Sequence, residues 1–205
     1  MEIRELAVPD AFEFTPIIRG DNRGAFLEWF RADHLEKATG RRLELLQANA
    51  SISASGSIRG VHFADVPPSQ AKYVFCPRGA LLDVVVDIRV GSPTFGAWDA
   101  VLLDDVDRRG LFVSEGLGHA FMALEDDTMI SYLCTATYNP GRERGINPLD
   151  PALGIDWPST ARDGSPLAPI LSAKDTEAPS LAEAEADGLL PRYDEVQAFL
   201  ESLRA

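Results

Sequence analysis

Seven short apolar segments between residues 43 and 138 constrain most strongly how this chain can fold. Stretches rich in glycine, proline, serine and aspartate separate them, as is typical of turns. The segments cover residues 43–53, 71–76, 80–90, 97–103, 110–115, 119–124 and 128–138. Strands of this length and spacing are typical of an antiparallel sandwich or barrel, and not of a parallel α/β sheet. The centre of the chain therefore predicts an all-β core.

Helical patterns lie on both sides of this core. Residues 31–40 predict a short helix that ends at Gly40. Beyond a turn-rich stretch, Ser180 and Glu183 have the spacing of a capping box at the start of a second helix. Residues 193–205 predict a last, amphipathic helix. The β core is thus expected to carry helices at both ends.

The length and composition favour one globular domain. Apolar residues make up 45% of the chain, yet no window approaches the ~18 uncharged apolar residues of a membrane span. The N-terminus carries acidic residues where a signal peptide needs an apolar run, so we expect a cytoplasmic protein. We expect a single domain over 1–205, with its β core at about 43–138 and a C-terminal helical extension at about 180–205.

Charge and cysteine content restrict the partners. A net charge of −13 argues against nucleic acid, whose phosphates require a basic patch. A small phosphorylated ligand remains possible, because it needs only a few cations at one site. Cys76 and Cys134 lie within apolar segments, and we expect both to be buried, reduced thiols.

The three histidines do not form a metal-binding pattern. His34 lies in the predicted N-terminal helix, His119 stands alone, and the residue two after His62 is Ala64. A metal-binding barrel would need clustered ligands, so we expect no metal. For His62, the residues alone leave two interpretations open, a strand histidine satisfied in the core and a catalytic base.

Alternation along two predicted strands places polar groups among apolar neighbours. In 128–138, Tyr132 shares a face with Ile130 and Cys134, and a phenol in that position must find a partner. In 80–90, one face carries Asp83, Val85, Asp87 and Arg89. From this pattern alone, Tyr132 is either a core tyrosine or a functional one.

Three cations occur at informative positions. Lys72 begins an apolar strand, where its ammonium is either solvated at the strand edge or met by an anion. Arg23 and Arg59 stand beside glycines, where arginines decorate turns or hold anionic groups.

Taken in order, these segments resemble the dTDP-4-dehydrorhamnose 3,5-epimerase family over roughly residues 10–180. The resemblance rests on DNRGAFLEWF, LLQANASIS, SIRGVHF, PPSQAKYVFCPRGALLDVVVDIRVGSPTFG, EGLGHAF, SYLCTATYNPGRERGINPLDPALGIDWP and ILSAKDTEAP. It implies a cupin-type jelly roll, a homodimer, and a reaction without metal or organic cofactor. The implied substrate is a dTDP-4-keto-6-deoxy-hexose, inverted at C3, C5 or both.

The resemblance also implies roles for individual residues. It makes His62 the catalytic base, Tyr132 the proton donor and Lys72 the group that holds the C4 oxygen. Asp175 would orient His62, with Asp83 as a possible second partner. The implied substrate-binding residues are Arg23, Arg59 and Lys174 at the diphosphate or sugar, Phe26, Glu28, Gln47 and Asn49 at the nucleotide, and His119 and Glu143 facing the ligand.

These residue types suit proton transfer next to a ketone. Histidine titrates near neutral pH and can remove a weakly acidic proton, while a carboxylate behind the ring stabilises the imidazolium. A fixed ammonium stabilises an enolate more than a neutral ketone. Inversion then requires an acid on the opposite wall of the pocket.

Some positions depart from the family pattern. Leu117-Gly118-His119-Ala120-Phe121 stands where F-A-H-G-F is usual, Ala64 replaces a polar residue, and the C-terminal extension is longer. These features resemble the branch that makes deoxysugars of secondary metabolites, some of whose members invert C3 only. The alternatives are therefore a C3-only epimerase, a related ketoisomerase, a non-catalytic cupin that binds a nucleotide sugar, and a metal-dependent cupin.

Overall fold

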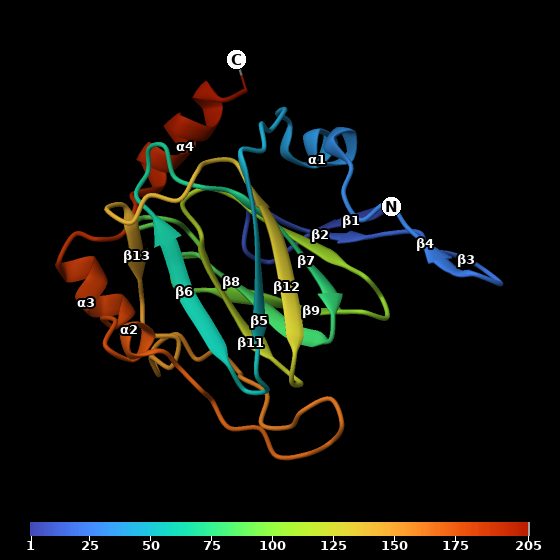
Figure 1. The fold of residues 1–205 in the computed structure, drawn as a ribbon. Coiled ribbons are helices and arrows are strands. Elements are labelled where there is room, and N and C mark those ends of the chain that lie inside the picture. The colour runs from blue at the N-terminus through green and yellow to red at the C-terminus, as the bar shows by residue number, and fades with distance from the viewer. Residues whose placement is uncertain (205) are drawn as a thin grey trace.

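Two antiparallel sheets form the body of the protein, as the sequence predicts (Figure 1). The computed structural model describes residues 1–204. One sheet has six strands in the order β1 (Glu2–Glu5), β2 (Ala11–Thr15), β10 (Gly110–Val113), β7 (Lys72–Arg78), β12 (Thr128–Cys134) and β5 (Gln47–Ser53). The other has five, in the order β13 (Glu143–Gly145), β6 (Ile58–Ala64), β11 (Gly118–Ala123), β8 (Ala80–Val86) and β9 (Trp98–Asp104). A separate hairpin pairs β3 (Arg19–Asp21) with β4 (Gly24–Phe26).

The helices lie near the chain ends. They are α1 (Ala32–Thr39), α2 (Ala173–Thr176), α3 (Leu181–Ala186) and α4 (Tyr193–Ser202). The predicted stop at Gly40 is confirmed, because this residue closes α1 in the left-handed conformation with a φ of 71°. The capping box of Ser180 and Glu183 is also confirmed at the start of α3. The short helix α2 was not predicted, and the last helix ends at Ser202.

The sheets extend beyond the predicted range of 43–138 and include a strand that the pattern did not reveal. β1 and β2 precede that range and β13 follows it, while β6 lies inside it. β1 is mostly exposed and charged, so it has no apolar signature. β6 contains Gly60, and the register between β6 and β11 shifts at a bulge, which breaks the simple alternation of a strand.

The predicted strand 80–90 ends at Val86 because its last polar residues enter a buried ion-pair network. Arg89 donates to Asp87 from Nε at 2.9 Å and to Asp10 from Nη1 at 2.6 Å. Asp87 also accepts hydrogen bonds from Ser92 and Thr94. The prediction that Asp87 and Arg89 continue the strand face of Asp83 is therefore wrong, since they close a loop instead.

The space between the two sheets is apolar over much of its length. Leu81 and Val85 of β8 face Val74 of β7 and Ile130 of β12 in one buried cluster. Cys76 also belongs to this cluster. Both Cys76 and Cys134 are buried free thiols, as predicted. Within residues 1–204, no helix is long and apolar enough to cross a membrane.

The ion-pair network around Arg89 gives a prediction about stability. Arg89 and Asp87 are both fully buried, so Arg89→Leu leaves a buried carboxylate without its cation. We expect the free energy of unfolding to fall by about 3–5 kcal/mol, measured by urea denaturation. Arg78→Leu is the control, because the Arg78–Asp127 pair is exposed on both sides and should change stability by less than about 1 kcal/mol. Equal effects of the two variants would contradict the assignment.

Candidate active site

Strand register brings most of the predicted site residues to the inner faces of the two sheets. Residues directly paired on antiparallel strands point to the same side of a sheet. Tyr132 pairs with Val74, and Lys72 lies two residues before Val74 on the same strand, so both face the core with this valine. On the other sheet His62 pairs with His119, which pairs with the core residue Val85. His62 therefore faces Lys72 and Tyr132 from the opposite wall.

His62 is held by Asp175. Its Nε2 lies 2.7 Å from Asp175 Oδ1, and the two residues are 113 positions apart in the chain. The segment before α2 pairs with β6, where Ile170 accepts from the amide of Ile58, and this contact brings α2 against the strand. Ser172 caps α2 by accepting the amide of Asp175. The position of the Asp175 carboxylate is thus fixed by the cap of its own helix and by the pairing of the segment before that helix with β6.

The ionisation of Asp175 follows from this arrangement. Burial alone would raise the pKa of its carboxyl, but the hydrogen bond and charge of His62, with the Ser172 contact, hold the pKa below its ordinary value. An ionised Asp175 accepts the Nε2 hydrogen of His62, so the lone pair of the ring is on Nδ1. The imidazole keeps an exposed fraction of 33%, so part of the ring remains open to a ligand.

Asp83 belongs to a second histidine. The sequence left it open as a further partner of His62, but its Oδ1 lies 2.6 Å from His119 Nε2. Asp83 is fully buried and His119 is nearly so. Among the described residues, the His62 ring is hydrogen-bonded only to Asp175, and Asp83 and His119 form a separate inner pair.

The burial of Lys72 disfavours the charged form of its side chain. Burial lowers the pKa of its ammonium, and the negative charges of Glu143 and Asp83 act in the opposite direction. A group of this kind gains most from a ligand that brings negative charge into the cavity.

Tyr132 is half-buried on the same sheet. Burial raises the pKa of its phenol, while its interaction with Asn49 and the charge of Arg59 partly oppose that rise. Its hydroxyl therefore keeps its proton at neutral pH. Asn49 pairs directly with Tyr132 across β5 and β12, and its amide also contacts Cys134 Sγ at 3.7 Å.

Other predicted residues surround an opening beside His62, which we call the mouth of the site. Arg59, Lys174, His62 and Asp175 line an opening of about 290 Å³ between β6 and α2. Arg59 is held by Ser53 Oγ at 3.2 Å, and Lys174 is exposed. Two cations thus stand beside the histidine.

Glu143 and Gln47 complete the inner lining at the edges of the two sheets. Glu143 pairs with Ala64, two residues from His62, and borders a cavity of about 490 Å³. Gln47 pairs with Cys134, and its amide donates to Asn49 at 2.9 Å. The predicted contacts of Gln47 with the nucleotide and of Glu143 with the ligand stay predictions.

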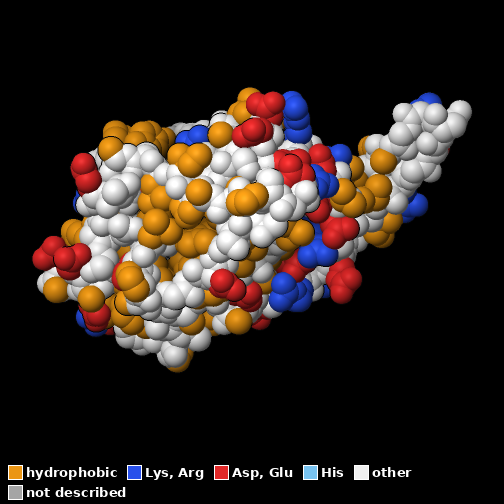
Figure 2. Space-filling model, turned by 90° about the horizontal axis from the view of Figure 1, so that it is seen from below, with side chains coloured by type: hydrophobic (Ala, Val, Ile, Leu, Met, Phe, Trp, Pro, Cys, Tyr) orange, Lys and Arg blue, Asp and Glu red, His pale blue; other side chains and the backbone are white. Residues whose placement is uncertain are grey.

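Three predicted residues are not brought to this site. Arg23 and Phe26 belong to the β3–β4 hairpin and Glu28 follows it, and all three are exposed. The hairpin extends away from the body of the protein (Figures 1 and 2). Within one chain, these side chains cannot meet a ligand beside His62.

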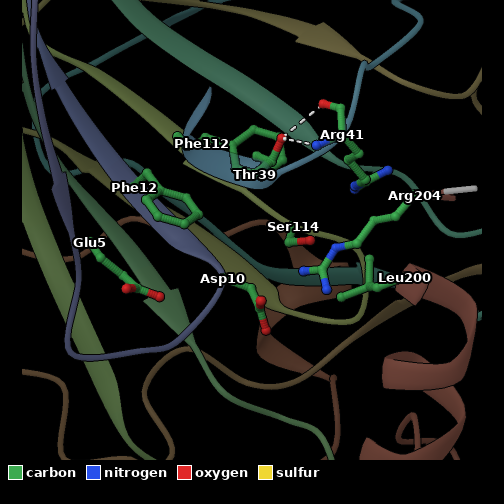
Figure 3. Close-up of a pocket in the computed structure, with 10 residues that line it drawn as sticks. Glu5, Asp10, Phe12, Thr39, Arg41, Phe112, Ser114, Leu200 and Arg204 are labelled. Atoms are coloured by element: carbon green, nitrogen blue, oxygen red, sulfur yellow. Dashed lines mark hydrogen bonds between the residues drawn. The ribbon is translucent and has the colours of Figure 1, made fainter. Parts of the chain in front are cut away.

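Another cavity lies apart from the site, between α1, β10 and α4 (Figure 3). It has a volume of about 230 Å³ and is lined by Asp10, Arg41, Ser114 and Arg204 among others. Arg41 forms a buried ion pair with Glu115 there. None of the residues that the sequence singled out borders this cavity.

Two site features were not predicted. Cys134 lies beside Lys72 and Asn49, although its sequence context indicated only a buried thiol. Ser172 caps the helix that presents Asp175, and its spacing of three from that residue is the signal that could have revealed α2. Among residues 1–204, no group of three or more His, Cys, Asp or Glu side chains could hold a metal ion.

Comparison with known proteins gives one consistent family. The model of the family described as dTDP-4-dehydrorhamnose 3,5-epimerase matches residues 5–183. A protein of that name from Mycolicibacterium smegmatis is 56% identical over 204 residues, which is 100% of this chain and 98% of the relative.

Solved structures agree with this match. The RmlC epimerase of Mycobacterium tuberculosis superposes with a TM-score of 0.94 at 52% identity, covering 99% of this chain and 100% of the other. ChmJ, a 3′-monoepimerase from Streptomyces bikiniensis in complex with dTDP-quinovose, gives 0.92 at 44% identity, covering 98% of both chains. The expected cupin-type jelly roll is thereby confirmed, and the chain belongs to the dTDP-4-dehydrorhamnose 3,5-epimerase family.

Proposed function

We propose that this protein epimerises a dTDP-4-keto-6-deoxy-hexose at C3 and C5 in deoxysugar biosynthesis. The observation that carries the proposal is the placement of His62, backed by Asp175, opposite Lys72 and Tyr132. This pairs a base on one wall with a cation and an acid on the other. We also propose that it works in the cytoplasm, where two free buried thiols stay reduced.

The first step is removal of a proton next to the C4 ketone. His62 accepts it on Nδ1, and the carboxylate of Asp175 stabilises the imidazolium that results. The electron pair of the broken C–H bond moves into the enolate, which places negative charge on the C4 oxygen. Lys72 binds that oxygen and stabilises the charge as it develops.

The second step is reprotonation from the other face. Tyr132 donates its phenolic proton to the carbon, and solvent restores it. The raised pKa of the phenol keeps this proton available at neutral pH. Arg59 and Lys174 at the mouth would hold the diphosphate, which does not react but positions the sugar. Gln47, Asn49, His119 and Glu143 would contact the remainder of the ligand.

A C3-only epimerase is the second candidate. The favouring observation is the 44% identity to a 3′-monoepimerase over almost the whole chain. A non-catalytic cupin that binds a nucleotide sugar is less well supported, because binding alone does not require a base and an acid on opposite walls.

We expect the enzyme to exchange solvent deuterium into the substrate. With dTDP-4-keto-6-deoxyglucose in D₂O, mass spectrometry and NMR should find deuterium at C3 and C5. Deuterium at C3 alone would establish the C3-only alternative. His62→Ala should lower the exchange rate by about 10²–10⁴-fold, because it removes the base, while dTDP binding measured by calorimetry stays unchanged. Exchange at neither carbon by the unaltered enzyme would exclude the proposed reaction.

We further propose that the active enzyme is a homodimer in which the β3–β4 hairpin reaches the partner's site. The hairpin carries Arg23 and Phe26 away from its own cavity. Phe26 is 67% exposed, and Ile17 and Ile18 beside the hairpin are exposed too. Apolar side chains in a projecting segment are typical of a surface covered by another chain.

Complementation between inactive variants tests this arrangement. His62→Ala and a hairpin double variant, Arg23→Ala with Phe26→Ala, should each have low activity alone. If every site combines His62 of one chain with the hairpin of the other, an equal mixture of refolded chains should recover about a quarter of full activity. Only mixed dimers contain an intact site, and they contain one. Mixing without gain would contradict the shared site.

A further inference from the structure

Asp83 has an oxygen that the structure leaves without a partner. Its Oδ1 meets His119 Nε2 at 2.6 Å, whereas Oδ2 is the only buried side-chain nitrogen or oxygen among residues 1–204 that makes no hydrogen bond. The side chain is fully buried. Burying an unpaired carboxylate oxygen is costly, so such a group persists where its charge has a use.

The inner face of the other sheet presents a cation to this carboxylate. Asp83 lies on β8 and shares its face with Leu81 and Val85 in the core, while Lys72 shares its face with Val74 in the same core. Glu143 and Asp83 are the two carboxylates whose negative charge acts on the Lys72 ammonium. One sheet therefore presents Lys72 to the interior, and the other presents the Asp83–His119 pair.

The other groups around Lys72 are a less firmly held carboxylate and a neutral thiol. The groups facing it are Glu143 from β13 and Cys134 from β12. The remaining titratable lining consists of His62, His119 and Tyr132, with Asp175 behind His62. Glu143 is partly exposed on a three-residue edge strand. Asp83 lies on a strand paired on both sides, by β11 and β9, so its position does not depend on solvent or ligand.

We propose that Asp83 is a positioning residue, the inner counter-ion that keeps the Lys72 ammonium charged and directed into the cavity. The hydrogen bond with His119 holds the carboxylate and leaves its second oxygen free, so that its charge can act on Lys72 through the interior. The inference rests on the proposed role of Lys72 at the C4 oxygen of the substrate. A neutral amine could not stabilise the enolate in that way.

The charge of Lys72 makes the activity depend on pH. Lys72 acts only when protonated, so activity falls as the pH rises through its pKa. Burial has already lowered that pKa, and Asp83 opposes the effect. Removing the charge of Asp83 therefore moves the loss of the ammonium to lower pH.

Lysine-selective NMR measures this without turnover. The chain has three lysines, Lys37, Lys72 and Lys174, so ¹³Cε-lysine labelling gives three signals, and Lys72→Arg identifies one by its disappearance. In Asp83→Asn, the titration midpoint of Lys72 should fall by about one pH unit or more. Val85→Ala changes packing on the same face without changing charge, and should leave the midpoint in place.

The NMR titration tests the role of Asp83 independently of the proposed reaction. An unchanged midpoint in Asp83→Asn would overturn the counter-ion role even if the enzyme is an active epimerase. A lowered midpoint would support it even if the substrate differs. Should Asp83→Asn not fold, Asp83→Ser removes the same charge with a smaller side chain and is read in the same way. In active variants, the basic limb of the kcat profile should move with the midpoint, whereas a purely structural defect would lower kcat equally at all pH values.

Discussion

The close approach of β6 to β11 at Gly60 is the constraint on which the site depends. A Cβ added to Gly60 would lie 2.5 Å from the Cβ of Ala120 and 2.6 Å from the carbonyl oxygen of His119, so no other residue fits there. The φ of this glycine is 127°, outside the range of ordinary residues. Next to it, the register between the strands shifts at a bulge. A bulge re-aims the side chains that follow it, and here it sets His62 beside His119 on the inner face.

One part of the sandwich interior stabilises the fold, and another part carries the groups proposed to react. Part of the inner face is filled by apolar side chains such as Leu81, Leu111 and Ile130. Elsewhere on the inner face, strands β7 and β8 direct Lys72 and Asp83 inward. Polar groups there weaken the core, because each must find a partner or remain costly to bury. The apolar part, together with buried ion pairs in the loops, compensates for that cost. The strands can therefore carry costly buried polar groups and still keep their register.

Alternation and turn chemistry predicted an antiparallel β core, a sandwich or a barrel, and most of its strands, because those signals are local. They also placed Tyr132 and Cys134 on one inward face correctly. They failed where a pattern is interrupted, as at Gly60 in β6, and where a polar residue leaves the strand, as Asp87 does. The link between His62 and Asp175 spans 113 residues and has no local signal, so only the family resemblance indicated it.

The charge distribution explains how an acidic protein can accept a diphosphate. The chain carries a net charge of −13, and unscreened repulsion would oppose an anionic ligand at a distance. At physiological salt, however, charges more than about 8 Å apart are largely screened, so the groups close to the ligand decide its binding. Arg59 and Lys174 stand at the cavity mouth, and the hairpin of a second chain would add Arg23. Further inside, the balance reverses, because Asp83 and Glu143 outnumber the single ammonium of Lys72. Excess negative charge there disfavours a preformed enolate and favours the neutral ketone. If Lys72 has the proposed role, stabilisation of the enolate must come from its ammonium, and the charge state of that ammonium would govern the reaction.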